Sequence, residues 1–170
     1  MSLIEELLAE FQAKGPTAST LDVLAPLVKD SRVTKIMLDV LADRRWKNLW
    51  DTAIIAFRDK VSSDPEQREQ LRRVLLRILA EEEDSLLRQL TALSLKFFAS
   101  RKDVEDVLVA LLKDPREACG VRVAALYTLA ETGSWQQREP LVRAMLSEQK
   151  TDIAQTAERI LARRSTASTD

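Results

Sequence analysis

The sequence predicts an all-α protein of stacked antiparallel helix pairs. Apolar residues recur with helical spacing along nearly the whole chain, which is typical of helices that each bury one face. The 170 residues include only three glycines and five prolines, too few for the many tight turns of a sheet protein. Short polar linkers separate the apolar stripes, as expected where consecutive helices lie antiparallel and side by side.

Ten apolar stripes predict about ten helices, each with one face buried against its neighbours. The stripe at 33–41 has apolar residues at i, i+3, i+4, i+7 and i+8 without a miss. In chain order, the stripes cover residues 4–11, 21–28, 33–41, 50–61, 71–79, 86–97, 104–112, 121–129, 141–146 and 153–161.

Capping residues mark where several of these helices begin. Asp64 precedes Pro65, which suits the first helical position, and Gln67 is placed to complete a capping box with Asp64. Either Asp84 or Ser85 is placed to cap the sixth helix.

Further signals bound the eighth and ninth helices and the end of the chain. Gly133 is placed to close the eighth helix as its C′ residue, and Ser134 begins a second capping box. Residues 165–170 contain no large apolar side chain, so we expect a disordered tail there. The remaining residues 1–164 are expected to form a single helical-repeat domain.

Composition excludes several classes of function. The chain has no histidine and one cysteine, Cys119, so we expect no catalytic triad, no metal site and no cofactor. The net charge of −1 does not favour nucleic acid as a partner. No apolar run is long enough to span a membrane, and the early acidic residues do not fit a signal peptide, so we expect a cytoplasmic protein.

Residues 107–133, VLVALLKDPREACGVRVAALYTLAETG, resemble a HEAT repeat. Asp114-Pro115 stops one helix and begins the turn. Ala124-Ala125 is the small pair that lets the second helix approach its partner closely. The family consists of helical repeats whose stacked pairs bury a continuous core.

The resemblance implies a short right-handed α-solenoid of about five stacked antiparallel helix pairs, HEAT-like, with about ten helices. Leu87-Arg88 precedes Val121-Arg122 by 34 residues, close to one repeat. The likeness is best at residues 103–164, weaker at 67–100 and weakest before Val61, so we expect an irregular N-terminal third.

Two prolines raise a question about how the helices pair. Pro26 and Pro140 share an offset that resembles the kink of first helices in HEAT repeats. Pairing from the C-terminus, however, makes the second predicted helix a second member of its pair. Either the N-terminal region has an extra helix or one proline match is accidental.

The resemblance implies a non-enzymatic scaffold or adaptor that binds a protein or peptide on a concave face lined by second helices. Arg88, Lys96 and Arg122 are expected there as a basic ladder for an acidic peptide. The alternative for Arg88 and Arg122 is pairing with an acidic neighbour that fixes the stacking of repeats. The oligomeric state stays open.

Tryptophans give two further candidate contacts and one alternative function. Trp135 is either an anchor between repeats or an exposed partner contact, and Trp46 is expected to be partly exposed, whereas Trp50 belongs to the core. Some HEAT-like DNA glycosylases use Trp, Asp and Arg, residue types that Trp46, Trp50, Asp51 and Arg58 also supply. A protein like the HEAT-type phycobilisome lyases is a third alternative, by analogy of fold.

Overall fold

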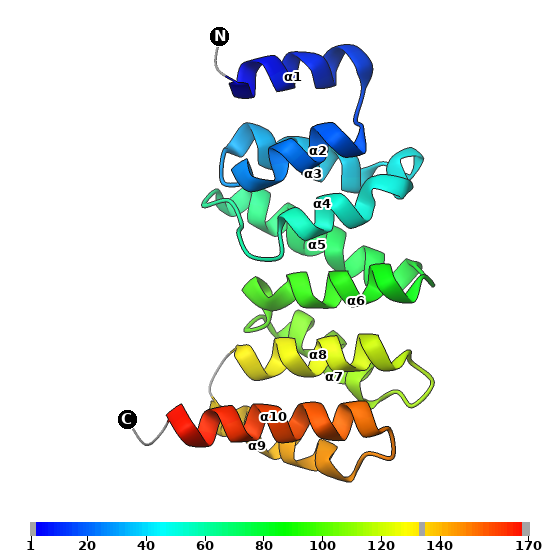
Figure 1. Ribbon diagram of the computed structural model, residues 1–170, viewed down its shortest axis with the longest axis vertical. Coiled ribbons are helices and arrows are strands. Elements are labelled where there is room, and N and C mark those ends of the chain that lie inside the picture. Colours follow the sequence, from blue (N-terminus) through cyan, green and yellow to red (C-terminus); the bar gives the residue numbers. More distant parts are fainter. Residues whose placement is uncertain (1–2, 133–134, 168–170) are drawn as a thin grey trace. The chain divides into compact units, whose positions relative to one another are not determined.

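The structure is a computed structural model that describes residues 3–132 and 135–167. Within these residues it contains ten α-helices, four short 3-10 helices and no strand, so the predicted all-α class is confirmed (Figure 1). The chain divides into two compact units, an N-terminal unit (Met1–Ala80) and a C-terminal unit (Glu81–Asp170). Each is described here by itself.

The N-terminal unit contains five of the helices and two 3-10 helices. They are α1 (Leu3–Lys14), α2 (Ala18–Leu24), η1 (Ala25–Leu27), α3 (Ser31–Ala42), η2 (Arg44–Leu49), α4 (Trp50–Ala56) and α5 (Pro65–Glu81), which ends at the unit boundary. Helix α4 packs against both α2 and α3, and α1 packs against α2. The largest fully buried side chains of this core include those of Leu21, Met37, Trp50, Ile54 and Phe57.

The C-terminal unit contains the other five helices. They are α6 (Ser85–Ser94), α7 (Lys102–Lys113), α8 (Cys119–Glu131), α9 (Trp135–Ala144) and α10 (Thr151–Ala167), with η3 (Leu95–Phe98) after α6 and η4 (Met145–Ser147) after α9. Helix α8 is central, because it packs against α6, α7, α9 and α10. Figure 1 shows α6, α8 and α10 side by side in one layer, the second-helix layer, with α7 and α9 behind them.

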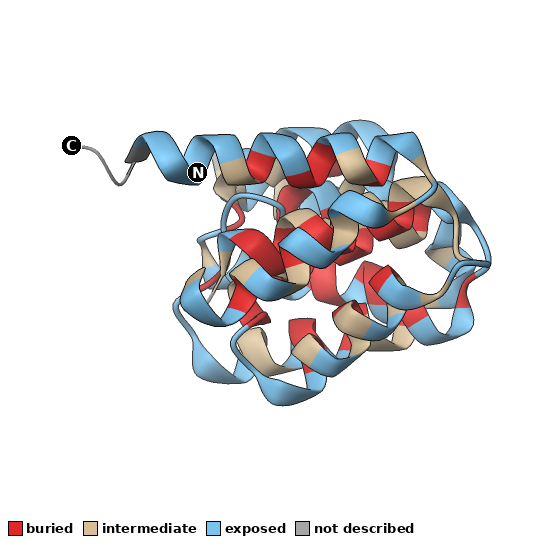
Figure 2. Ribbon diagram, turned by 90° about the horizontal axis from the view of Figure 1, so that it is seen from below, coloured by how far each residue is buried: buried red, intermediate tan, exposed pale blue. Residues whose placement is uncertain are grey.

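Burial follows this layering. The buried residues of α8 include Val121, Ala124, Ala125 and Leu129, and those of α10 include Ile153, Ala157 and Ile160. Figure 2 shows buried segments facing the interior between helices and exposed segments on the outer sides. The predicted close approach at Ala124-Ala125 is therefore present, because both alanines are fully buried in the packed side of α8.

Helix starts agree with the predicted caps in two cases and differ in one. Asp64 Oδ1 accepts from the backbone N–H of Glu66 and of Gln67, at 2.8 and 3.0 Å. The predicted capping box is wrong, because the Asp64 N–H donates to the Ser62 hydroxyl at 3.1 Å and the Gln67 Oε1 makes no hydrogen bond with the described residues. Asp84 caps α6 by accepting from the Leu87 N–H at 2.7 Å. The predicted signals at 133 and 134 lie outside the described residues.

The predicted buried stripe of α6 is wrong by one position. Its four members are exposed or half-buried: Leu86, Leu90, Leu93 and Phe97. The buried stripe comprises Leu87, Thr91, Leu95 and Phe98. Thr91 can occupy the core because its hydroxyl donates to the Leu87 carbonyl at 2.7 Å, which satisfies its polar atom locally. A prediction of the buried face from apolar residues alone therefore does not include Thr91.

The two prolines occupy different places. Pro140 lies inside α9, a first helix, whereas Pro26 lies in η1, after α2 has ended. Figure 1 shows α2 in one layer with α4, and α3 behind them, so α2 is the second member of its pair. The proline match is therefore accidental. The N-terminal third is irregular in another way, because α2 and α4 have only 7 residues each and adjoin 3-10 helices.

Helix α10 ends at Ala167, so residues 165–167 of the predicted tail are helical, and residues 168–170 lie outside the described residues. The domain limits of 1–164 stay a prediction.

Two glycines allow a test of whether the positive φ at the end of α1 requires glycine. Gly15 closes α1 with φ of +79°, a conformation that costs other residues about 1–2 kcal/mol. A methyl group there would lie 3.5 Å from the Trp46 ring, an ordinary contact. We expect Gly15→Ala to lower the free energy of unfolding by about 1 kcal/mol, measured by urea denaturation.

Gly120 is the control, because it lies inside α8. A methyl group there would meet only the movable end of the Gln89 side chain, 2.6 Å from Oε1. Since alanine favours helix over glycine by up to about 1 kcal/mol, Gly120→Ala should be neutral or stabilising. Equal destabilisation by both substitutions would contradict the assignment.

Candidate functional site

The five residues predicted to contact a partner lie in both units. Trp46 is in η2 of the N-terminal unit. The other four lie in the C-terminal unit: Arg88 in α6, Lys96 in η3, Arg122 in α8 and Trp135 at the start of α9. The site is therefore built from the C-terminal unit, where four of the five lie.

Arg88 forms its polar contacts within the protein. Its side chain is 14% exposed, and one guanidinium nitrogen donates to the Glu82 carbonyl at 3.1 Å. The other terminal nitrogen forms a short ion pair with Glu117, whose side chain is 13% exposed. Glu117 lies in the loop between α7 and α8, so Arg88 connects its own helix to the loop of the following repeat.

Arg122 occupies the equivalent place in α8 and makes equivalent contacts. It is 2% exposed, its Nε donates to the Leu112 carbonyl at 2.8 Å, and Nη2 pairs with Glu148 in the loop before α10. The hydrogen bond from Arg122 lowers the pKa of the Glu148 carboxyl. This geometry favours the stacking role considered for the two arginines, because neither guanidinium is open to a partner.

The first helices are connected in a similar way. Arg138 of α9 is 7% exposed and forms a short ion pair with Glu105 of α7. The hydrogen bond from Arg138 lowers the pKa of the Glu105 carboxyl. Sequence reasoning missed Arg138, because its partner lies 33 residues away and no local pattern joins the two.

Lys96 and Trp135 are half-buried and each takes part in a cation–π contact. The Lys96 Nζ lies 5.3 Å from the centre of the Phe97 ring. The Arg164 guanidinium lies 5.2 Å from the Trp135 ring centre and also donates to the Ala130 carbonyl at 2.9 Å. Trp135 therefore anchors the start of α9 to the last turns of α10.

The tryptophans of the N-terminal unit have packing roles. The Trp46 ring is half-buried and lies beside the end of α1, where a methyl group added to Gly15 would be 3.5 Å from it. Trp50 is 1% exposed and its indole N–H donates to the Val40 carbonyl at 2.9 Å, as expected for a core residue. Trp50 is therefore not available to stack on an extruded base, and the exposed Arg58 pairs with its neighbour Asp59.

Two hollows lie end to end between α8 and α10, on the second-helix layer, and we call them together the α8–α10 groove. The hollow near the start of both helices has a volume of about 290 Å³ and is lined by Cys119, Gly120, Val123, Asp152, Gln155, Thr156 and Arg159. The hollow near their C-terminal ends has a volume of about 190 Å³ and is lined by Tyr127, Ala130, Glu131, Ile160, Arg163 and Arg164.

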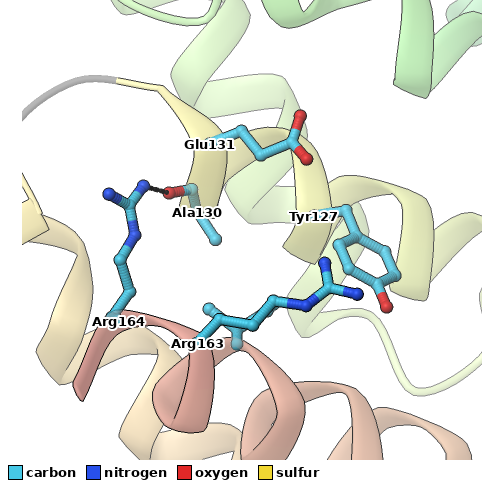
Figure 3. Close-up of a pocket in the computed structure, with 6 residues that line it drawn as sticks. Tyr127, Ala130, Glu131, Arg163 and Arg164 are labelled. Carbon is cyan, nitrogen blue, oxygen red and sulfur yellow. Dashed lines mark hydrogen bonds between the residues drawn. The ribbon is translucent and has the colours of Figure 1, made fainter. Parts of the chain in front are cut away.

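Two arginines of α10 border the groove and differ from the buried ones. Arg159 and Arg163 are exposed, one helical turn apart, and form no ion pair with the described residues. Figure 3 shows Arg163 extending across the second hollow toward Tyr127 and Glu131 of α8, while Arg164 turns to Ala130. The sequence gives little signal for them, because Arg163 lies at the edge of the apolar stripe 153–161, three residues after Ile160.

Two negative observations concern the described residues. No group of three or more Cys, Asp or Glu side chains among them is arranged to hold a metal ion. No helix among them has the length and apolar character needed to cross a membrane.

Removing the buried guanidinium should be costly. We expect Arg122→Met to lower the free energy of unfolding by about 2–4 kcal/mol, because it leaves the buried Leu112 carbonyl without its donor and breaks a buried pair. Chemical denaturation measures the change. Arg116→Met is the control, since Arg116 is 90% exposed, and it should change the value by less than about 0.5 kcal/mol. Similar effects of the two substitutions on the free energy of unfolding would contradict the structural role assigned to Arg122.

Stability should fall in acid. The Arg72 hydrogen bond lowers the pKa of Glu69 from 4.5 to about 2, and Arg122 and Arg138 lower those of Glu148 and Glu105. Unfolded carboxyls take up protons first, so this stabilisation is complete above about pH 5 and is lost as the pH falls toward 2. Urea midpoints measured from pH 7 to 2.5 test this. Glu69→Gln should flatten part of the curve, and an unchanged curve would contradict the assignment.

A family model of HEAT repeats matches residues 72–162, more than half of the chain. The match begins in α5 and ends in α10, so it covers most of residues 103–164, where the sequence resemblance is strongest, and most of residues 67–100, where it is weaker. A search of curated proteins and a search of solved structures found no match.

Proposed function

Because this chain belongs to the HEAT-repeat family, we propose that it is a non-enzymatic scaffold or adaptor that binds a protein or peptide partner. HEAT repeats commonly mediate protein–protein interaction, since stacked second helices present a broad surface to a partner. The lack of histidine agrees with a binding role, because histidine is the side chain most often used for acid–base catalysis.

The α8–α10 groove supports this proposal best. It is an open trough along two neighbouring helices, with apolar Val123 and half-buried Tyr127 on one wall and exposed Arg159 and Arg163 on the other. Apolar surface beside charged groups that lack internal partners is the combination that binding sites for peptides use. We therefore place the partner on the second-helix layer of the C-terminal unit.

The residues expected from the sequence take different parts in this proposal. Lys96 lies in η3, directly after α6, and stays a candidate contact. Arg88 and Arg122 act indirectly, by holding the loops from which α8 and α10 begin. Trp135 and Trp46 act as anchors within the fold.

The alternative functions have less support. A glycosylase of the kind considered would need Trp50 on an open face, whereas Trp50 is buried. The phycobilisome-lyase analogy and the cytoplasmic location stay predictions.

Filling the groove should weaken binding. In a selection of random displayed peptides on the full chain, we expect peptides whose affinity falls at least about tenfold on Val123→Trp, since an indole there would occupy the first hollow. Fluorescence anisotropy of the recovered peptides measures the change.

The matched control is Ala110→Trp, which adds the same side chain to an exposed position of α7, outside the groove. It should leave the affinities unchanged. Failure to enrich any peptide, or equal binding to both variants, would contradict the proposed face.

A further inference from the structure

We propose that the partner segment is an extended acidic peptide, with carboxylates at two alternate positions that bind Arg159 and Arg163 in the α8–α10 groove. This inference rests on the proposed function and adds the chemistry of the partner. It depends on which arginines remain open, on their spacing and on the opposite wall of the groove.

Five arginines of the C-terminal unit fall into two groups, and a sixth, Arg164, is held in the groove by the Trp135 ring and the Ala130 carbonyl. Arg88, Arg122 and Arg138 are buried or nearly so, and each pairs with a glutamate of the following or preceding repeat. Arg159 and Arg163 are exposed beside the groove and form no ion pair with the described residues. They are therefore the guanidinium groups of the groove that an external carboxylate can reach, and guanidinium binds carboxylate in a strong two-pronged geometry.

The spacing of the two arginines fits alternate residues of an extended chain. They lie four residues apart in α10, which corresponds to about 6 Å along the helix axis. Residues i and i+2 of an extended peptide point to the same side and lie about 6.5–7 Å apart. Two acidic side chains at i and i+2 can therefore face both guanidinium groups while the peptide lies along the groove.

The opposite wall determines the residue between the two acids. In an extended chain, residue i+1 points away from i and i+2, and here it would face α8. That wall presents Val123 and the ring of Tyr127, whose hydroxyl makes no hydrogen bond with the described residues. The groove therefore suits an acidic–apolar–acidic sequence.

Charge in the groove favours a peptide over a nucleic acid. Glu131 and Asp152 line the same two hollows as the arginines, so positive and negative charge alternate along the groove. A phosphodiester chain carries a negative charge at every link and would be placed against both carboxylates. A peptide that has acids only at alternate positions avoids this repulsion.

The test uses the full chain and three labelled probes. The first is an extended peptide with Glu-Phe-Glu between Gly-Ser flanks, the second is its Gln-Phe-Gln analogue, and the third is a short single-stranded oligothymidylate. We expect the Glu peptide to bind at least about tenfold more tightly than the Gln peptide, with a preference that weakens as salt is added. Fluorescence anisotropy gives the three affinities.

Two double variants locate the effect. Arg159→Gln/Arg163→Gln should remove the preference for the Glu peptide. Arg101→Gln/Arg143→Gln removes the same charge from exposed positions outside the groove and should retain it. All four positions are on the surface, and circular dichroism verifies that both variants stay folded.

Several results would overturn the inference. They are absence of binding by the Glu peptide, equal affinity for the Glu and Gln peptides, a preference that survives Arg159→Gln/Arg163→Gln, and tighter binding of the oligonucleotide. The displayed-peptide selection distinguishes failure of this inference from failure of the proposed binding function. Selected peptides that lose affinity on Val123→Trp but contain no paired acidic residues would support the binding face and contradict the acidic partner.

Discussion

The ion pairs of Arg88 in α6 and Arg122 in α8 are the contacts on which the C-terminal unit depends. A guanidinium group is stable in a protein interior only if most of its N–H groups find acceptors, because burial removes its water. Arg122 meets this requirement with the Leu112 carbonyl and Glu148, although its Nη1 has no partner. The requirement fixes the loop before α10 against α8, and so it fixes the distance between the two walls of the groove.

The loop between α7 and α8 is contacted from both neighbouring repeats. Arg88 reaches it from the preceding second helix through Glu117. Lys150 reaches it from the following loop and donates to the Pro115 and Glu117 carbonyls at 3.3 and 3.4 Å. Each repeat is thus held by its two neighbours, in agreement with the largely nearest-neighbour stability of helical repeats. Removing one of these contacts should therefore loosen the adjacent loop before it affects the rest of the chain.

Much of the fold could be predicted from local sequence, because helix periodicity and caps are local properties. Asp64 and Asp84 cap helices as expected, and Trp50 is in the core. The register of α6 could not be predicted by counting apolar residues, since Thr91 is buried with its hydroxyl satisfied within its own helix. The partners of Arg122 and Arg138 could not be predicted either, because each pair joins residues more than 25 positions apart. Without those partners, buried arginines are indistinguishable from exposed ones such as Arg163.

The parallel course of α8 and α10 gives the groove a direction. Both helices begin at the end where Cys119 and Asp152 lie and finish at the end where Glu131 and Arg163 lie. Along α10, the groove therefore passes from the Asp152 carboxylate to the guanidinium groups of Arg159, Arg163 and Arg164. A bound segment with unequal charge at its two ends would have lower energy in one orientation than in the reverse. The fold can thus distinguish a sequence from the same residues in opposite order, a form of selectivity that composition alone would not reveal.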